Sequence, residues 1–328
     1  MKLGNYEFKY GISLAPMAGY TDSAMRVLCH RLGAEFSTTE MVSAKAVTFG
    51  DAKTFSLASV REAEGPVAIQ IFGSEPDIMA KAAEILTKRE PKDGVSRPFA
   101  IDINMGCPVN KIFKNGEGSA LMRDPELIRR IVLAVSGAVN LPVTVKIRAG
   151  IDEKSRNAVE CAEAAEDGGA AMITVHGRTR AEFYSGFADR EIIREVKKGV
   201  RVPVIANGDV YSGADALAML RDTGADGVAV GRGAVGNPFV FTEIKAALSG
   251  EPYTPPTLKE KIEIAKEQLS LSVLDKGERI AVAEARKQIA SYFSSFRGAA
   301  ALRAAINRAT TEAEVLELLG SFGAGEQG

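Results

Sequence analysis

Short apolar segments that favour β-strands alternate with amphipathic segments that favour helices from the N-terminus to about residue 248. The candidate strands span residues 12–15, 35–39, 67–71, 99–103, 143–147, 172–175, 204–206 and 227–230. Expected helices between them include residues 23–32, 77–88, 125–138, 156–167 and 213–222. Eight strands with eight following helices predict an α/β fold, a closed (β/α)8 TIM barrel.

A doubly wound open sheet is the alternative architecture. Its usual dinucleotide-binding turn, Gly-x-Gly-x-x-Gly after the first strand, is absent here. The first turn reads Ala15-Pro16-Met17-Ala18-Gly19 instead. Good helix N-caps at Asp22, Asp124 and Ser212 support the helix assignments in both architectures.

The alternation stops at residues 250–256, which are rich in glycine and proline. Everything after Thr257 favours helix, and Thr311 with Glu314 forms a capping-box pattern for the last helix. The chain has 328 residues, more than the roughly 250 of a typical barrel. We therefore expect a barrel domain over residues 1–250 and an all-helical domain over residues 251–328.

Bulk composition excludes several classes of protein. The net charge is −1, so no global field indicates a polyanionic partner. Three cysteines and no signal peptide predict a reducing, cytoplasmic location, with Cys29 and Cys161 as core residues. Two histidines and no paired cysteines argue against a metal, and no apolar run is long enough to cross a membrane.

Polar residues stand near the carboxyl ends of five of the candidate strands. They are Gln70, Asn104, Lys146 with Arg148, His176 and Asn207. Side chains alternate across a strand, so Lys146 and Arg148 share one face. The carboxyl ends of parallel strands are where α/β enzymes build their sites. This end of the barrel is therefore the predicted active site.

Cys107 follows the fourth strand in the sequence Asn104-Met105-Gly106-Cys107-Pro108. Most free cysteines are small packed hydrophobes, and that is one interpretation of Cys107. The other is chemistry, because a lone loop cysteine without a disulfide partner is a candidate reactive group. Its position among the polar strand ends favours the second.

A window without acidic residues runs from 285 to 311 and contains five cations. Tyr292, Phe293 and Phe296 are interleaved with them. One interpretation is a solvated helical face whose aromatic residues pack in the bundle core. The other is a phosphate-binding surface of the kind that a nucleic-acid enzyme needs. The sequence leaves both open.

Several motifs resemble the flavin-dependent tRNA-dihydrouridine synthases, in particular the bacterial branch with the B-type enzymes. They are Ala15-Pro16-Met17-Ala18-Gly19-Tyr20-Thr21-Asp22, Thr39-Glu40-Met41, Asn104-Met105-Gly106-Cys107-Pro108, Lys146-Ile147-Arg148, His176-Gly177-Arg178-Thr179, Asn207-Gly208-Asp209 and Gly231-Arg232-Gly233-Ala234. The match runs from about Leu14 to Phe239 and continues weakly around Arg286-Lys287 and Phe296-Arg297-Gly298. The combination of Asn-x-Gly-Cys-Pro with His-Gly-Arg-Thr is highly specific.

The resemblance implies an FMN cofactor, NADPH or NADH as reductant, and a uridine in tRNA as substrate. Hydride would pass from the nicotinamide to FMN and then to C6 of uracil, and Cys107 would deliver a proton to C5. A thiol with a pKa of about 8.5 is mostly protonated at neutral pH, which suits a general acid. A flexible loop over residues 109–118 would move over the substrate.

Further roles follow from the resemblance together with position in the barrel. The cofactor would be bound by Pro16, Met17, Ala18, Gln70, Lys146, His176, Asn207, Gly208, Asp209, Gly231 and Arg232. The tRNA would be contacted by Asn104, Arg148, Arg178, Lys111, Arg286, Lys287 and Arg297. Alternatives remain for two of these residues: Lys146 could pair with Asp102, and His176 could be structural.

Two other functions compete with this one. An FMN-dependent barrel oxidoreductase acting on a free pyrimidine, such as a dihydroorotate dehydrogenase, would also use a catalytic cysteine. A non-catalytic RNA-binding protein on a barrel scaffold is the second. The His-Gly-Arg-Thr segment and the basic helical appendage favour the tRNA enzyme, which we expect to be a monomer. The sequence does not indicate which tRNA uridine is reduced.

Overall fold

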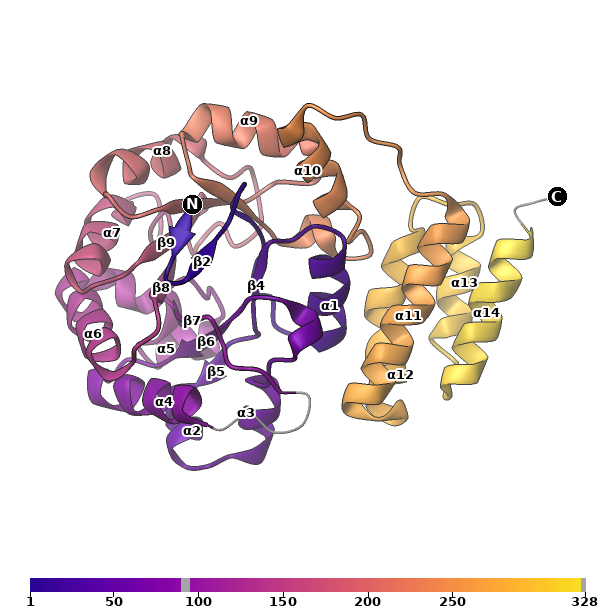
Figure 1. Ribbon diagram of the computed structural model, residues 1–328, viewed down its shortest axis with the longest axis horizontal. Helices are drawn as coiled ribbons and strands as arrows, with labels where there is room; N and C mark the ends of the chain where they lie inside the picture. The colour runs from indigo at the N-terminus through magenta and orange to yellow at the C-terminus, as the bar shows by residue number, and fades with distance from the viewer. Residues whose placement is uncertain (90–94, 326–328) are drawn as a thin grey trace.

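Parallel strands close into a barrel in the computed structural model, which describes residues 1–89 and 95–325 (Figure 1). The barrel strands are β3 (Ile12–Leu14), β4 (Phe36–Thr38), β6 (Val67–Phe72), β7 (Ala100–Asn104), β8 (Val143–Arg148), β9 (Met172–His176), β10 (Val204–Asn207) and β11 (Gly227–Val230). They follow the order β4-β3-β11-β10-β9-β8-β7-β6, and pairing of β4 with β6 closes the ring. The TIM-barrel prediction is confirmed, and the open-sheet alternative is wrong.

Helices follow the strands and cover the outside of the barrel (Figure 1). The longer ones are α1 (Ser23–Arg31), α4 (Pro76–Lys88), α6 (Pro125–Ala138), α7 (Ala158–Asp167), α8 (Arg190–Gly199), α9 (Gly213–Thr223) and α10 (Val240–Ser249). The expected N-caps are present, since Asp22, Asp124 and Ser212 each accept a backbone N–H of the first turn. After β4 the pattern differs: β5 (Val42–Ser43), α2 (Ala44–Thr48) and α3 (Ala52–Leu57) replace one long helix.

A short N-terminal hairpin covers the amino-terminal end of the barrel. Its strands are β1 (Lys2–Leu3) and β2 (Tyr6–Glu7). Leu3 and Phe8 pack with Phe36 and Phe99 in the barrel interior, where they are nearly fully buried. This hairpin was not predicted from the sequence, because two-residue strands have no measurable periodicity. With that end packed, room for a ligand is at the opposite end, where the strands finish.

The C-terminal part is a helical bundle beside the barrel (Figure 1). It contains α11 (Leu258–Lys276), α12 (Glu278–Gln288), α13 (Ala299–Ile306) and α14 (Glu312–Gly325), around a hydrophobic cluster of its own. The capping box of α14 is present: Glu314 N–H donates to Thr311 Oγ1 at 3.3 Å, and Thr311 N–H donates to Glu314 Oε2 at 3.4 Å. The expected boundary at residue 250 falls between α10 and α11, and we keep the two-domain division as a proposal.

Ion pairs and hydrogen bonds join the bundle to the barrel. Arg31 of α1 pairs with Glu267 of α11 at 2.5 Å, and Lys276 pairs with the capping carboxylate of Asp22 at 2.6 Å. Gln288 of α12 donates to the carbonyl of Gly19 at 3.1 Å. Gly19 belongs to the loop after β3, so α12 contacts the loop that borders the ligand end of the barrel.

Candidate active site

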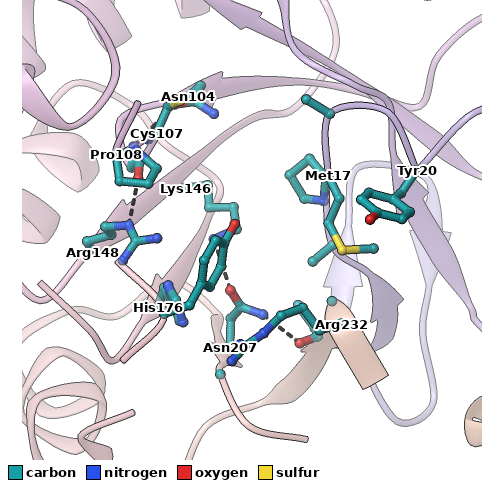
Figure 2. Close-up of a pocket in the computed structure, with 18 of the residues that line it drawn as sticks. Met17, Tyr20, Asn104, Cys107, Pro108, Lys146, Arg148, His176, Asn207 and Arg232 are labelled. Atoms are coloured by element: carbon teal, nitrogen blue, oxygen red, sulfur yellow. Dashed lines mark hydrogen bonds between the residues drawn. The ribbon is translucent and has the colours of Figure 1, made fainter. Parts of the chain in front are cut away.

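A cavity of about 650 Å³ lies at the carboxyl ends of the barrel strands (Figure 2). The structure brings together in its lining the predicted residues Pro16, Met17, Ala18, Gln70, Asn104, Cys107, Lys146, Arg148, His176, Asn207, Gly208, Asp209, Gly231 and Arg232. Figure 2 shows Cys107, Arg148 and Lys146 on one side and Met17 and Tyr20 on the other. Their roles in binding and catalysis are not tested by this placement and stay predictions.

Cys107 is held at the cavity wall by its backbone. Its N–H donates to Asn104 Oδ1 at 2.9 Å, and its carbonyl accepts from the hydroxyl of Ser119 at 2.8 Å. Burial raises the pKa of the Cys107 thiol, against a backbone hydrogen bond at Val109 and the charge of Arg148. The thiol is therefore protonated at neutral pH and can donate a proton. By contrast, Cys29 and Cys161 are fully buried, as expected of core residues.

The segment after Cys107 forms the short helix α5 (Asn110–Lys114) and then returns to the cavity wall. Gly118 has φ +60°, and a Cβ there would lie 3.0 Å from the Cβ of Cys107, so the return needs glycine. Phe113 lies under two guanidinium groups, Arg123 at 4.4 Å and Arg180 at 3.9 Å from the ring centroid. Lys111 is exposed on this helix. The expected movement of the segment stays a prediction.

Lys146 presents an ammonium group to the cavity from β8. Its Nζ donates to Asn207 Oδ1 at 3.0 Å (Figure 2). Burial and the neighbouring charge of Arg148 lower the pKa of Lys146 to about 8. The alternative partner Asp102 instead accepts from Gln70 and Thr144, and among the described residues no ion pair joins it to Lys146. Lys146 is thus charged at pH 7 and retains N–H groups for a ligand.

Arg148 fastens two loops of the site. Its Nε donates to the carbonyl of Gly106 at 2.8 Å, and its Nη1 donates to the carbonyls of Thr179 at 2.9 Å and Phe183 at 3.1 Å. The Arg148 side chain is 3% exposed. It therefore positions the loop that carries Cys107 relative to the loop after β9.

Two glycine-containing loops form the part of the cavity where a phosphate is expected. Asp209, with φ +53°, follows Gly208 and accepts from Arg178 Nη1 at 2.9 Å and from Arg232 Nη2 at 3.2 Å. Burial acts to raise the pKa of Asp209, but Arg178 and Arg232 hold it below its usual value. Arg178 is 1% exposed, is not part of the cavity lining, and also bonds the carbonyl of Gly186 at 2.6 Å. Its expected contact with the nucleotide stays a prediction.

His176 is neutral in this setting. Burial lowers its pKa well below the usual value, and the charges of Lys146, Arg148, Arg178 and Arg232 lower it further. Its ring faces the loop of Gly208, where a Cβ would come within 3.0 Å of Cδ2. A neutral imidazole can donate or accept a hydrogen bond but cannot supply positive charge to a phosphate.

The basic window of the bundle divides into two parts. Tyr292 and Phe293 are buried in the bundle core, as the structural interpretation predicts. The cations are outside: Arg286, Lys287 and Arg297 are exposed, and the Lys287 ammonium lies 3.8 Å from the ring centroid of Tyr20. Because Tyr20 lines the cavity, Lys287 places one of these exposed cations at the rim of the site, while Arg286 donates to the carbonyl of Ala309 within the bundle at 3.1 Å.

Sequence reasoning missed several lining residues: Tyr20, Met41, Phe183, Tyr184, Val210, Tyr211 and Val235. Phe183 and Tyr184 are 43% and 48% exposed, and they lie next to each other in the loop after β9, which also carries the exposed Phe187. Two adjacent aromatic residues in such a loop were the available signal. In the described residues no cluster of three or more His, Cys, Asp or Glu side chains could hold a metal ion, and no helix is long and apolar enough to cross a membrane.

Solved structures share the barrel. Histamine dehydrogenase from a Rhizobium species aligns with a TM-score of 0.56 at 14% identity, over 83% of this chain and 50% of that chain. A variant of NCR from Zymomonas mobilis aligns with a TM-score of 0.51 at 16% identity, over 80% of this chain and 93% of that chain. At such low identity these likenesses concern the fold alone.

Sequence relatives are much more similar. A probable tRNA-dihydrouridine synthase of Rickettsia conorii is 40% identical over 324 residues, covering 98% of this chain and 96% of the relative. The tRNA-dihydrouridine synthase B of Xanthomonas axonopodis pv. citri is 40% identical over 312 residues, covering 95% and 92%. The free-pyrimidine alternative is not favoured by these matches. The model of the family described as "Dihydrouridine synthase (Dus)" matches residues 13–323, and the chain belongs to that family.

Proposed function

We propose that the cavity binds FMN and that the protein reduces the C5–C6 double bond of specific uridines in tRNA, with NADPH or NADH as reductant. Membership of the dihydrouridine synthase family supports a flavin-dependent oxidoreductase that acts on uridine. The finer assignments, FMN, the nicotinamide and the residues that contact each, rest on the chemistry of the cavity. We also propose that the protein acts in the cytoplasm as a monomer.

The residues present fit a flavin mononucleotide. At the phosphate end, Gly208 has φ +123°, and a Cβ there would lie 2.5 Å from the Cβ of Ala188. Only glycine leaves backbone N–H groups accessible in such a turn. Arg232 adds a cation at the same place, while Gln70 and Lys146 supply polar groups deeper in the cavity. Met17 adds an apolar wall for a flat ring system.

A bound flavin would supply the hydride that uracil receives at C6. The protein supplies the proton: the raised pKa of Cys107 keeps the thiol protonated until negative charge develops at C5. Lys146, charged at neutral pH, stabilises negative charge on the ligand. Arg148 holds the Cys107 loop against the loop after β9, which keeps the thiol in position.

The helical bundle would hold the tRNA. Its exposed cations Arg286, Lys287 and Arg297 give phosphate contacts without a large net charge on the protein. Lys287 reaches the cavity rim over Tyr20, so RNA bound to the bundle is directed to the site.

The observation that carries this proposal is that Cys107 and Lys146 lie on one wall of a cavity whose phosphate end is lined by glycines. The test is to incubate purified protein with unmodified tRNA and NADPH and to measure dihydrouridine. Heat denaturation of the same sample should release free FMN. Colourless protein that cannot be reconstituted with FMN, or flavin-loaded protein that forms no dihydrouridine in any tRNA, would refute the proposal.

A further inference from the structure

Asp102 is a buried carboxylate beneath the cavity, and strand register explains its partners. It lies opposite Gln70 of β6 on one side and Thr144 of β8 on the other. Gln70 Nε2 donates to Asp102 Oδ2 at 2.7 Å, and Thr144 Oγ1 donates to Asp102 Oδ1 at 2.5 Å. Burial raises the pKa of the Asp102 carboxyl, while the hydrogen bonds from Thr144 and Gln70 and the charge of Lys146 act against that rise and favour the ionised form. An ionised carboxylate can only accept hydrogen bonds. Gln70 must therefore turn its amino group, and not its oxygen, toward Asp102.

The orientation of the Gln70 amide determines the orientation of the Asn104 amide, which contacts the Cys107 loop. With its amino group committed, Gln70 turns its Oε1 to Asn104, whose Nδ2 donates to it at 2.8 Å. Asn104 then has its Oδ1 toward the loop, where it accepts from the N–H of Cys107 at 2.9 Å and of Gly106 at 3.3 Å. Each amide carries its acceptor and its donors at opposite ends, so one orientation determines the next.

We propose that Asp102 is a positioning residue that sets the orientation of the Gln70 and Asn104 amides, and through them fastens Cys107. Both lone pairs of Asn104 Oδ1 are used by backbone N–H groups, and one N–H of its Nδ2 has no acceptor within residues 1–89 and 95–325. Asn104 lines the cavity beside Cys107 (Figure 2), so it offers a ligand only a donor. The ligand atom that meets it must be an acceptor. Under the proposed function, on which this last consequence rests, that atom is a carbonyl oxygen of uracil.

We call the hydrogen-bonded chain Asp102–Gln70–Asn104 the relay. Asn104→Asp tests it because this change places a carboxylate, which can only accept hydrogen bonds, on each side of Gln70. Gln70 can turn its amino group to only one carboxylate, and its oxygen then faces the other. One of the two carboxyl groups has to bind a proton, so its pKa in the folded protein lies above that in the unfolded chain. Adding Asp102→Asn removes the conflict, because the amide at position 102 can donate to Gln70 Oε1 and Gln70 Nε2 can donate to the new carboxylate.

The experiment is thermal unfolding of the full-length protein at pH 5 and pH 8, for the wild type, Asn104→Asp, Asp102→Asn and the double variant. A carboxyl whose folded pKa is raised destabilises the fold above its unfolded pKa, so the loss grows with pH. We expect the Tm of Asn104→Asp, relative to wild type, to be several degrees lower at pH 8 than at pH 5. At pH 8 the double variant should regain at least half of the Tm difference between Asn104→Asp and the wild type. The other charged or titratable groups nearby, Lys146, Arg148 and Cys107, are the same in every variant.

Asn157→Asp is the matched control. Asn157 Nδ2 donates to the carbonyl of Met122 at 2.7 Å, so this change also turns a carboxylate toward a buried acceptor, but outside the relay. Asp102→Asn should not rescue it. If Asn104→Asp does not fold at pH 8, recovery of folded protein in the double variant is itself the rescue.

The inference is overturned if the Tm of Asn104→Asp, relative to wild type, is no lower at pH 8 than at pH 5. It is also overturned if the double variant has no higher Tm at pH 8 than Asn104→Asp. Enzyme activity with tRNA is a second measurement, independent of thermal unfolding. The rescued double variant has a carboxylate at position 104 and no N–H, so its kcat/KM for tRNA should fall at least 10-fold, as expected for a lost hydrogen bond of roughly 1.4 kcal/mol. Rescue of stability in a protein that forms no dihydrouridine even as wild type would refute the proposed function and leave the relay intact.

Discussion

Lys146→Met should stabilise the flavin-free protein while removing its activity. Burial lowers the pKa of Lys146 from 10.5 to about 8, which means that the folded protein holds the ammonium at a cost of about 3 kcal/mol. Methionine has a similar length and no charge. Its introduction loses the hydrogen bond to Asn207 Oδ1 and leaves that oxygen unpaired, at about 1–2 kcal/mol. The net expectation is a gain of about 1–2 kcal/mol at pH 7.

The pH dependence distinguishes this account from a simple packing effect. Between the folded pKa of about 8 and the unfolded pKa of 10.5, the unfolded chain binds more protons at Lys146, so wild-type stability rises with pH in this window. The advantage of Lys146→Met should therefore be largest below pH 8 and lost on the way to pH 10.5. Urea unfolding of flavin-free protein at several pH values measures it. Lys198→Met, on an exposed face of α8, is the control and should show neither effect. A loss of stability at pH 7 in Lys146→Met would refute the reasoning.

Three further changes separate the parts of the site. Cys107→Ala should keep flavin binding and flavin reduction by NADPH but slow uridine reduction roughly 10²–10⁴-fold. If tRNA reoxidises the reduced variant at the wild-type rate in a rapid-mixing experiment, Cys107 is not the acid. Replacing Arg286, Lys287 and Arg297 with Ala should leave FMN content unchanged and reduce the log–log salt slope of tRNA binding by about 0.7–0.9 per lost contact. An unchanged slope in a well-folded variant would mean that the RNA is held elsewhere. Gly208→Ala should lower FMN affinity, because its Cβ would lie 2.5 Å from another Cβ at φ +123°, and equal flavin titrations for variant and wild type would exclude a role for this loop.

The barrel and the meeting of the strand-end residues could be predicted because both follow from periodicity. Apolar runs at regular spacing predicted the strands to within a residue or two, and the five strands β6 to β10 each end one residue later than predicted. Alternation within β8 put Lys146 and Arg148 on the cavity side together. These are properties of the local chain, and the closed ring adds only the pairing of β4 with β6.

What could not be predicted depends on contacts between distant segments. Asp102 could be predicted only as a possible partner of Lys146, because the sequence does not show the strand register that places Asp102 between Gln70 and Thr144. The partners of Arg178 are of the same kind: its guanidinium bonds Asp209 and the loop after β9, while its expected contact with the nucleotide stays a prediction. Loop geometry decides these partners, and no short motif encodes it.

Counting the donors of the buried cations separates those that hold the protein together from those that face a ligand. The guanidinium of Arg178 has its Nε and both Nη atoms bonded to Ser185, Gly186 and Asp209, so few N–H groups remain for another molecule. Arg148 uses Nε and Nη1 on carbonyls, and among the residues that the structure describes the two N–H groups of its Nη2 have no acceptor. It can therefore fasten the Cys107 loop and contact a ligand at the same time.

Lys146 has three N–H groups and, within the described part of the chain, one bonded acceptor, Asn207. It is thus the buried cation with the largest share of its donors available, and its low pKa shows how incompletely the protein alone solvates it. A negatively charged or carbonyl-bearing ligand would complete that solvation. The solvation that the folded chain does not give the Lys146 ammonium can be supplied by a ligand, so a residue that costs the flavin-free protein stability is also suited to stabilise negative charge on its ligand.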